Sequence, residues 1–521
     1  MNNNSKNSQT TLGLDFGTAY SFPACKVPDS DPEILLTLEK FAVCDKGIPS
    51  LFWSDRNGNV RVGSNAAIRN AEWNDAKGVV RSIKTKLHEK EFRLYQKTYT
   101  PKEIVKKIME NIFQLAQEKI EEDDILLPEE KRIVMGVPVN FGDYERNLLR
   151  SAVKELGYSV ELLPEPMAAA TYYAYKNPNK FNKVLVFDMG AGTFDVAFLE
   201  KNDSPSYEEP YPYRCPKKGF DGNMKAGDVI DEYLTEYIRD RFEPKPSKEL
   251  AEALRDKNTV EYRQLLLVAK KIKEIMSNKS IHTENFSLGA QNGFFVTVTR
   301  EELEKVAAPV VNEAVDMCWK IIKNCHMENQ DFSIIMVGGM SNLEMIREAL
   351  AHRFPVQAKE NKIQKKNPTR AVALGCAIYA EQPVLSRRVT FGYAVASYYN
   401  NKSVLSVEIP ADVKLPYVVE SHYATRHNNQ TEVEFRIYEV EDAKEGEHLP
   451  IERGNSGNYL TVIHPFGQSV PMGTEVTFRI ELTESGILNV SVEDDGISKK
   501  TVRDFSIGIE NLDIVRGRNG G

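Results

Sequence analysis

The sequence predicts a duplicated α/β domain followed by an all-β sandwich domain. In residues 11–381, short apolar runs alternate with longer segments of helical periodicity, as in α/β proteins. Residues 389–508 instead alternate apolar and polar side chains with period two and carry frequent turn signals, as antiparallel strands do. We therefore expect a disordered tail at 1–10, the α/β domain at 11–381, a linker at 382–388, the β-domain at 389–508 and a disordered tail at 509–521.

The elements of the α/β part follow from the same patterns. Buried strands are predicted at residues 133–139 and 184–187, which are continuous apolar runs. Helices are predicted at residues 101–119, 144–156 and 311–324 from their apolar spacing. Pro101 suits the first turn of its helix, where a missing N–H group costs little.

Composition limits the classes of function. The 521 residues are 41% hydrophobic and 27% charged, which suits a multidomain globular protein. The net charge of −8 argues against a general nucleic-acid binder, which needs a basic face. The polar start MNNNSKNSQT does not resemble a secretory signal, and no apolar run is long enough to span a membrane. The six cysteines form no CxxC pair, so we expect no disulfides and no structural zinc, which suits a reducing compartment. Together these observations predict a cytoplasmic protein without a nucleic-acid partner or a membrane partner.

A strand followed by a glycine-rich turn occurs twice. The two copies are TLGLDFGT at residues 11–18 and VLVFDMGAGT at residues 184–193. Glycine lets backbone N–H groups gather into a nest that suits phosphate. Asp15 and Asp188 would face that phosphate, which makes sense if Mg²⁺ lies between them. One such turn alone is more often only a turn, but the matched pair predicts a nucleotide–Mg²⁺ site between two lobes.

A third glycine turn follows the apolar run of residues 334–337, in the string IIMVGGMS. Gly338 and Gly339 would let the backbone approach a flat base or sugar closely. Tight packing between the strand and the next helix explains the same two glycines equally well. The residues alone leave both interpretations open.

The three motifs, in this order, resemble the sugar kinase, actin and heat-shock ATPase superfamily, and most closely the heat-shock protein 70 (DnaK-type) chaperone family. The phosphate loops of that family resemble GLDFGTAYS and VLVFDMGAGTFDVAFLE, and its adenosine motif resembles VGGMSNLEMIREAL. Its connecting region resembles GVPVNFGDYER and LLPEPMAAATYYAY. Its peptide-binding β-domain, which sugar kinases and actins lack, resembles LPYVVESHYATRHNNQTEVEFRIYE and VTFRIELTESGILNVSVED. The resemblance covers about residues 11–508 and implies an actin-like ATPase domain with a peptide-binding β-sandwich.

The resemblance implies a role for each matching residue of the ATPase domain. Asp15 and Asp188 match carboxylates that hold Mg²⁺ through its waters. Lys84 matches a catalytic lysine, with Lys86 as a rival, and Glu165 matches the glutamate that positions the attacking water. The implied catalytic set is Lys84, Glu165, Asp195 and Thr193. The implied nucleotide contacts are Gly17, Thr18, Ala19, Tyr20, Gly190, Ala191, Gly192, Thr193, Gly227, Lys273, Ser277, Gly338, Gly339, Met340 and Asn342.

Two further sets concern the second domain. Pro138 and Arg146 match the proposed switch between the nucleotide site and the β-domain, although Pro138 could equally be an ordinary proline that ends a strand. The apolar residues that align approximately with the lining of the peptide groove are Leu405, Tyr423 and Val433. A place in the sandwich core explains each of these three equally well, because the strand register is not known from the sequence.

Departures from the family pattern affect the nucleotide base, the linker and the lid. Met340 and Asn342 stand where the family has serine and arginine, and Lys270 stands where it has glutamate. We expect nucleotide binding with remodelled base contacts. The linker QPVLSRR is not acidic and leucine-rich, so we expect coupling between the domains either to use other contacts or to be weak. Residues 509–521 are too few for the helical lid, so a lidless member is expected.

The resemblance implies an ATP-dependent chaperone that hydrolyses ATP to ADP and phosphate, with Mg²⁺ and K⁺ as candidate cations. Its implied partners are unfolded or extended polypeptide, a J-domain co-chaperone and a nucleotide exchange factor. The departures leave open an ATP-binding scaffold or regulator whose β-domain binds one dedicated partner. A small-molecule kinase is a third hypothesis, which the β-sandwich and the pairing of Lys84 with Glu165 disfavour.

Overall fold

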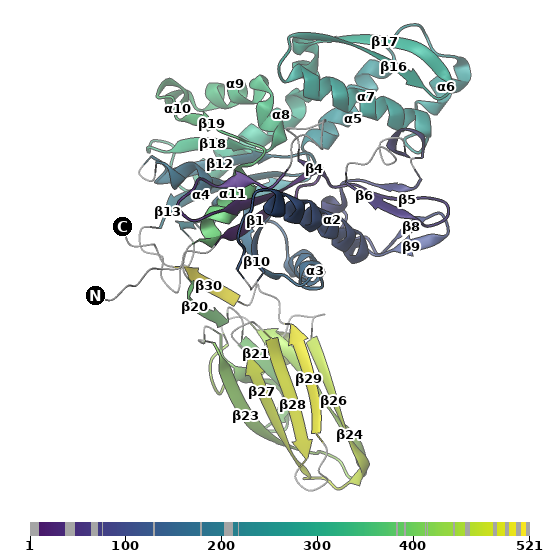
Figure 1. Cartoon of the computed structure of the whole chain (residues 1–521). Coiled ribbons are helices and arrows are strands. Elements are labelled where there is room, and N and C mark those ends of the chain that lie inside the picture. The colour runs from purple at the N-terminus through teal and green to yellow at the C-terminus, as the bar shows by residue number, and fades with distance from the viewer. Residues whose placement is uncertain are drawn as a thin grey trace. The chain divides into compact units, whose positions relative to one another are not determined.

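The computed structural model of the chain consists of two compact units (Figure 1). The first ends at Glu381, and the second contains the described residues from Val384 onward. The described residues are 10–36, 47–63, 71–75, 77–128, 131–177, 180–202, 212–216, 218–381, 384–389, 392–411, 413, 415–440, 443–453, 459–482, 487–494, 500–506 and 512–516. In this part of the chain, no helix has the length and apolar character needed to cross a membrane.

The first unit contains two six-stranded sheets with matching strand order (Figure 1). In each sheet an antiparallel hairpin carries a glycine-rich loop, and the first strand of the hairpin also pairs with a parallel neighbour. The first sheet has the order β11 (Ser159–Pro164), β10 (Arg132–Val137), β1 (Thr11–Asp15), β2 (Tyr20–Lys26) and β3 (Glu33–Ile34), with β4 (Ile48–Pro49) on β2. The second has the order β19 (Ile363–Lys365), β18 (Ser333–Val337), β12 (Lys183–Met189), β13 (Phe194–Lys201) and β14 (Tyr213–Arg214), with β15 (Phe220–Asn223) on β13. The repeat therefore extends from the loop motif to the whole sheet.

Two helices pack on each other, and each occupies the same place in its half of the repeat. Helix α4 (Glu165–Tyr175) follows β11, and α11 (Ala371–Ala380) follows β19. A Cβ atom on Gly375 would lie 1.8 Å from the carbonyl oxygen of Ala168, so only glycine allows the two helices to approach this closely. This contact fixes the start of α4, which carries Glu165.

The remaining helices surround these layers. Capping boxes explain two helix starts, because Thr100 and Thr299 each exchange hydrogen bonds with a glutamate three residues later. The helix that was expected at residues 311–324 therefore begins earlier, at Arg300. The helices are α2 (Pro101–Glu122), α3 (Asp143–Lys154), α5 (Gly227–Arg239), α6 (Lys248–Ala253), α7 (Val260–Met276), α8 (Arg300–Asn324), α9 (Glu344–Arg353) and α10 (Pro355–Lys359), with 3-10 turns η1 (Ile83–Thr85) and η2 (Gly339–Asn342). Smaller strands are β5 (Phe52–Ser54), β6 (Val60–Val62), β7 (Val79–Val80), β8 (Phe92–Leu94), β9 (Lys97–Tyr99), β16 (Ile281–Leu288) and β17 (Gln291–Thr299).

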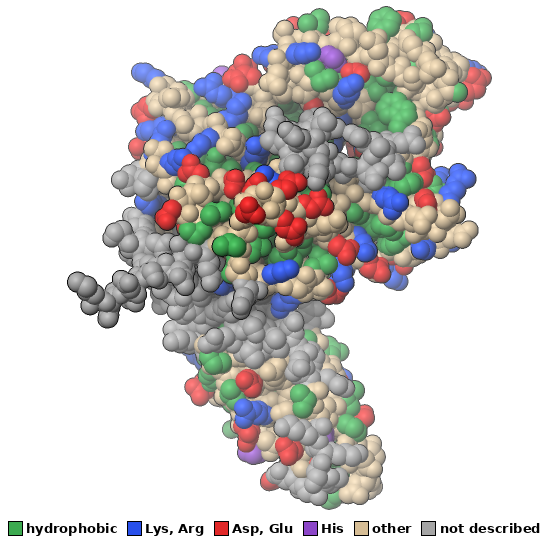
Figure 2. Space-filling view, viewed as in Figure 1, with side chains coloured by type: hydrophobic (Ala, Val, Ile, Leu, Met, Phe, Trp, Pro, Cys, Tyr) green, Lys and Arg blue, Asp and Glu red, His purple; other side chains and the backbone are tan. Residues whose placement is uncertain are grey.

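Part of the net negative charge gathers on one face of the first unit. Figure 2 shows acidic side chains over the region where Figure 1 places α2. The end of α2 and its cap contribute the exposed Glu121, Glu122 and Asp123. This face repels the phosphate backbone of nucleic acids.

The second unit is a sandwich of two antiparallel sheets. The core between them contains large buried side chains from both sheets, among them Phe435, Phe466 and Phe478. The first sheet has the order β25 (His448–Pro450), β22 (Lys402–Ile409), β21 (Gly392–Tyr399), β24 (Gln430–Val440) and β26 (Tyr459–Val470), and η3 (Ile451–Arg453) follows β25. The second has the order β23 (Tyr417–Ala424), β27 (Glu475–Leu482), β28 (Ile487–Asp494) and β29 (Lys500–Ser506).

The structure corrects the expectations for the linker and the C-terminal tail. Strands β20 (Val384–Val389) and β30 (Leu512–Arg516) pair with each other in an antiparallel ribbon. Ile514 and Val515 are β-branched residues, which favour a strand over the disordered tail that was expected here. At the other end, Thr10 is buried directly before β1. The remaining residues of the two predicted tails, 1–9 and most of 509–521, lie outside the described residues.

A buried polar pair links strands of the two sandwich sheets. His464 Nε2 lies 3.0 Å from Asp494 Oδ2, its Nδ1 lies 2.9 Å from Thr501 Oγ1, and the imidazole is fully buried. Asp494→Ala should lower the free energy of unfolding of this unit by about 3 kcal/mol, because it leaves Nε2 of a buried imidazole without its carboxylate partner. Thr501→Ala, the control, should cost about 1 kcal/mol. Urea unfolding checks both, and equal costs would show that the carboxylate adds nothing.

Candidate active site

The two glycine-rich loops of the first unit face each other. A Cβ atom on Gly192 would lie 2.7 Å from Thr18 Cγ2 and 2.6 Å from Thr85 Cγ2. Only glycine therefore allows the second loop to approach the first loop and η1. The hydroxyl-bearing Thr18 and Thr193 are both buried in this region. The loops that the sequence separates by a domain length thus belong to one site.

A buried lysine–glutamate pair lies beside the ends of these strands. Lys84 Nζ, on η1, donates a hydrogen bond to Glu165 Oε1 at 2.5 Å, and the two side chains are 4% and 8% exposed. The charges of Glu165, Asp15 and Asp195 all act on Lys84. Asp188 is the strand partner of Asp195 and is also buried. The structure thus brings together four carboxylates and one ammonium group.

This excess of buried negative charge raises the pKa values of the aspartate carboxyl groups. Burial, and then the charge of Glu165, raise the pKa of Asp15 to about 7, although Lys84 acts in the opposite direction. The same two causes raise the pKa of Asp195 to about 7. They also raise the pKa of Asp188 well above its usual range. Burial lowers the pKa of Lys84, but Glu165 and Asp15 more than compensate, so its pKa is raised and the ammonium stays charged.

The donor set fits a hydrated divalent cation. Mg²⁺ usually keeps several of its waters and is bound by one or two carboxylates with phosphate oxygens. Among the described residues, no three His, Cys, Asp or Glu side chains are close enough to ligate a metal together. Asp195 Oδ1 is buried without a hydrogen-bond partner. A cation held through its waters by Asp15 and Asp188 would relieve the repulsion between the carboxylates.

The residues expected on the base side gather around the start of α5. Lys273 Nζ donates to the carbonyl of Gly227 at 2.8 Å and forms a 2.7 Å ion pair with the buried Asp231. A Cβ atom on Gly227 would lie 3.0 Å from the sulfur of Met340. The charge of Lys273 is thus already matched by Asp231. The hydroxyl of Ser277 instead donates to the carbonyl of Glu274 at the end of α7.

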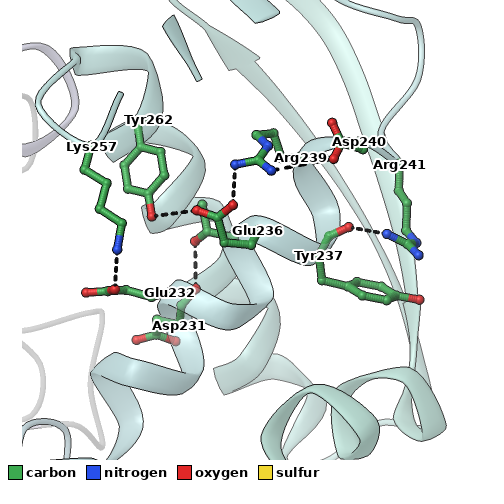
Figure 3. A network of polar contacts seen from close by, with 10 residues as sticks. Asp231, Glu232, Glu236, Tyr237, Arg239, Asp240, Arg241, Lys257 and Tyr262 are labelled. Atoms are coloured by element: carbon green, nitrogen blue, oxygen red, sulfur yellow. Dashed lines mark hydrogen bonds and ion pairs between the residues drawn. The ribbon is translucent and has the colours of Figure 1, made fainter. Parts of the chain in front are cut away.

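Helix α5 begins at Gly227, and hydrogen bonds hold it both at its first turn and further along. Its first turn is bound to the second loop, because Gly227 N donates to the Gly190 carbonyl and Asp228 N to the Ala191 carbonyl, at 3.2 and 2.6 Å. Further along, a surface network joins α5 to the region before and at the start of α7 (Figure 3). In it, Lys257 Nζ donates to Glu232 at 2.7 Å, and the Tyr262 hydroxyl donates to Glu236 at 3.5 Å.

Gly338 and its neighbours support the tight-packing interpretation of the third turn. Gly338 has φ +82°, and a Cβ atom there would lie 2.2 Å from the carbonyl oxygen of Met189. The turn therefore packs directly on the end of β12 and continues into η2, which contains Gly339, Met340 and Asn342. Contact of this turn with a base stays a prediction. In the first loop, the ring of Tyr20 lies 5.5 Å from Lys270 Nζ, which links that loop to α7.

Sequence reasoning missed two groups that connect the site with its surroundings. Ser82 Oγ donates to Asp228 Oδ2 at 2.9 Å, although the two residues lie far apart in the sequence. Phe141 joins the two expected coupling residues, because its N–H donates to the Pro138 carbonyl at 3.3 Å and its carbonyl accepts from Arg146 Nε at 2.9 Å. The Phe141 ring lies 5.9 Å from Lys84 Nζ, so both coupling residues are one contact from the lysine.

The three residues expected in the peptide groove all pack inside the sandwich unit. Leu405 is fully buried in a small cluster with Val440 and Leu449. The Tyr423 ring packs against Phe435 and Phe478, and its hydroxyl donates to Glu408. Val433 packs against the same core. Their structural role is therefore visible, and peptide contact stays a prediction.

Exposed aromatic residues occur instead at the end of β21. Tyr398 and Tyr399 are 43% and 48% exposed. The Arg426 guanidinium, from the segment between β23 and β24, lies 3.2 Å from the centre of the Tyr398 ring. Tyr399 stacks on His448 with 3.9 Å between ring centres. Two adjacent tyrosines ahead of the hairpin Asn400-Asn401 were the signal in the sequence that could have identified this surface.

Two matched sheets with facing glycine-rich loops and a buried cluster of acids and lysine define the class of two-lobed nucleotide-hydrolysing enzymes. The family model described as Hsp70 protein matches residues 65–511, so the chain belongs to the Hsp70 family. Proteins of this family are ATP-dependent chaperones and ATPases, and the chain is an ATPase of this kind. They bind ATP or ADP, in general together with Mg²⁺.

Relatives with the printed name chaperone protein DnaK match almost the whole chain. The protein of Thermosipho melanesiensis is 27% identical over 514 residues, which cover 95% of this chain and 80% of the relative. That of Thermotoga neapolitana is 28% identical over 519 residues, covering 94% and 79%. That of Thermoplasma volcanium is 26% identical over 510 residues, covering 94% and 76%.

Proposed function

We propose that the first unit is an actin-like ATPase domain whose nucleotide state controls the binding of extended polypeptide by the β-sandwich. The observation that carries this proposal is the Lys84–Glu165 pair, buried beside three aspartates at the ends of the repeated strands. A surface ion pair would contribute little, whereas this pair is withdrawn from water, where charge acts strongly on a reacting phosphate. A purely structural pair would not need three more carboxylates around it.

In the proposed mechanism each side chain has one task. Backbone N–H groups of the two glycine-rich loops, with Thr18 and Thr193, hold the phosphates. Asp15 and Asp188 would hold Mg²⁺ through its waters, and the cation would supply charge neutralisation at the phosphate oxygens. Lys84 stabilises charge that develops on the transferred phosphoryl group, and its ammonium also orients the carboxylate to which it is bonded.

Two carboxylates remain for the attacking water. Glu165 is held by Lys84 and is the group proposed to orient the water or accept its proton. Asp195, whose buried Oδ1 lacks a partner, is proposed to bind the same water. On the base side, Asn342 stands in the position of the arginine, and Met340, in the position of the serine, offers a polarisable apolar surface. The cofactors would be ATP or ADP with Mg²⁺ and K⁺.

For the β-domain, we propose that the surface of Tyr398, Tyr399 and Arg426 contributes to binding extended polypeptide. Exposed tyrosines supply large amphipathic contact areas at low cost in side-chain entropy. The accompanying partners would be unfolded polypeptide, a J-domain co-chaperone and a nucleotide exchange factor, in the cytoplasm.

Fluorescence anisotropy of a labelled unfolded peptide tests the binding surface. Tyr398→Ala and Arg426→Ala should each weaken binding by about 1–2 kcal/mol, or roughly five- to thirtyfold. The matched control is Tyr459→Ala, which removes another exposed tyrosine with its own arginine, Arg436, at 5.4 Å. Equal losses in all three variants would refute the assignment. A chain that binds only one native protein and no unfolded peptide would instead be the dedicated scaffold.

A further inference from the structure

The second unit contains a two-stranded ribbon that lies outside the two sandwich sheets. Its strands are β20, which precedes the sandwich in the sequence, and β30, which follows it. The register pairs Val389 with Leu512 and continues through Val384 with Arg516, with one irregularity between Val384 and Ser386. The ribbon therefore joins the two ends of this unit's chain.

A ribbon of only two strands has little stability of its own. Within the described residues, β20 and β30 share no strand with either sandwich sheet. A two-stranded sheet without further packing is at best marginally stable in water. The register places residue 388 of β20 opposite residue 513 of β30. Because β30 follows β29 after a short stretch of chain, a strand that opens also finds its partner again readily.

We propose that β30 is a displaceable strap that withholds one edge of the linker strand β20 from another extended polypeptide strand. An antiparallel neighbour uses the N–H and C=O groups along a strand edge, so one edge accepts one neighbour at a time. A strand that competes with β30 for this edge should resemble β30 in sequence. It should lack proline, with a carboxylate residue at the position opposite Arg388 and a β-branched residue at the position opposite Arg387. The proposal does not depend on ATP hydrolysis or on the peptide surface at Tyr398.

Cysteine pairs in the full chain test the register. Residues opposite each other in an antiparallel ladder have Cα atoms about 4.5–5.5 Å apart, within the range for a disulfide. Oxidation of the Val389→Cys/Leu512→Cys variant should therefore give an intramolecular disulfide, identified by mass spectrometry of tryptic peptides. The control, Val389→Cys/Asp513→Cys, is shifted by one residue and should cross-link at least about tenfold more slowly. Equal cross-linking of both pairs, or a disulfide only between two copies of the chain, would overturn the strap.

A peptide with the sequence of β30 tests displacement. Ile514→Pro in the full chain removes a backbone donor and should open the ribbon, whereas Ile514→Thr keeps a β-branched residue. Fluorescein-labelled NLDIVRG should bind the Ile514→Pro chain at least about tenfold more tightly than the unchanged and Ile514→Thr chains. The same peptide with proline in place of its isoleucine should not bind. Equal affinity for all three chains, or equal binding of the proline-containing peptide, would overturn the proposal.

Discussion

Lys84→Ala should slow ATP hydrolysis by about a hundredfold or more, because the buried ammonium is the only described cation paired with Glu165 in the cluster. Removing it leaves Glu165 without its 2.5 Å hydrogen bond and leaves the developing charge on phosphate uncompensated. Glu165→Gln should slow the reaction to a similar degree, because an amide neither accepts a proton nor holds the lysine by charge. Single-turnover release of phosphate from ATP measures both effects, and ADP affinity shows whether the site is still formed.

Lys86→Ala is the matched control for this prediction. Lys86 lies two residues away, but its Nζ donates to the backbone carbonyl of Arg81 and not to a carboxylate of the cluster. Its removal should leave the rate of hydrolysis nearly unchanged. A slow Lys86→Ala enzyme beside a normal Lys84→Ala enzyme would transfer the catalytic role to the rival lysine.

Binding of Mg²⁺ and ADP should strengthen as the pH rises through 7 and release protons near neutral pH. In the nucleotide-free chain, burial and Glu165 raise the pKa of Asp15 and Asp195 to about 7, from an ordinary value of 3.8. Below pH 7 these groups carry protons that compete with the cation. The apparent affinity should fall by up to about tenfold per pH unit for each proton displaced.

The same shifts set the sign of the pH dependence of stability. Because the folded pKa lies above the unfolded one, the folded chain binds more protons between about pH 4 and 7. The contribution of Asp15 and Asp195 to stability is complete below pH 4 and is lost as the pH rises through 7. Thermal unfolding without nucleotide should therefore reveal a loss of stability across this range, which Mg²⁺ and ADP reverse.

Titration calorimetry in buffers of different ionisation enthalpy counts the protons released. Asp195→Asn should remove part of the release. Asp55→Asn should change nothing near pH 7, because Asp55 is a surface residue whose pKa is lowered by hydrogen bonds from Asn59. Identical affinity at pH 5.5 and 8 with no proton release would contradict the arrangement of charges described for the site.

Local patterns predicted the loops of the site, and contacts distant in sequence decided the rest. Strand ends, glycines and aspartates lie next to each other in the chain, so Asp15 and Asp188 could be proposed from spacing alone. The choice between Lys84 and Lys86 could not, because it depends on how η1 turns. Ser82, before η1, has φ +52° and donates to Asp228 on another helix. No pattern within a few residues reports that contact.

In the β-domain, register limited what the sequence could predict. Leu405 and Ile409 have the same parity in β22, yet they lie in different apolar clusters. The pairing of β21 with β22 shifts between Tyr393 and Ala394, and such an irregularity changes which side chains face the core. Assigning Leu405 to a groove from alignment alone could not account for that shift. The strand β30 was not predicted for a related reason. All strands of the sandwich separate it in the sequence from its partner β20, so no local pattern indicates that the two strands pair.

Stopped-flow release of a fluorescent unfolded peptide tests the central claim, that nucleotide at the buried cluster controls the β-sandwich. Mixing the peptide complex with Mg²⁺ and ATP should raise the peptide off-rate, whereas ADP should not. Thr193→Ala, which removes a buried hydroxyl from the second glycine-rich loop, should abolish the increase. An off-rate that is the same with ATP, with ADP and without nucleotide would contradict the account.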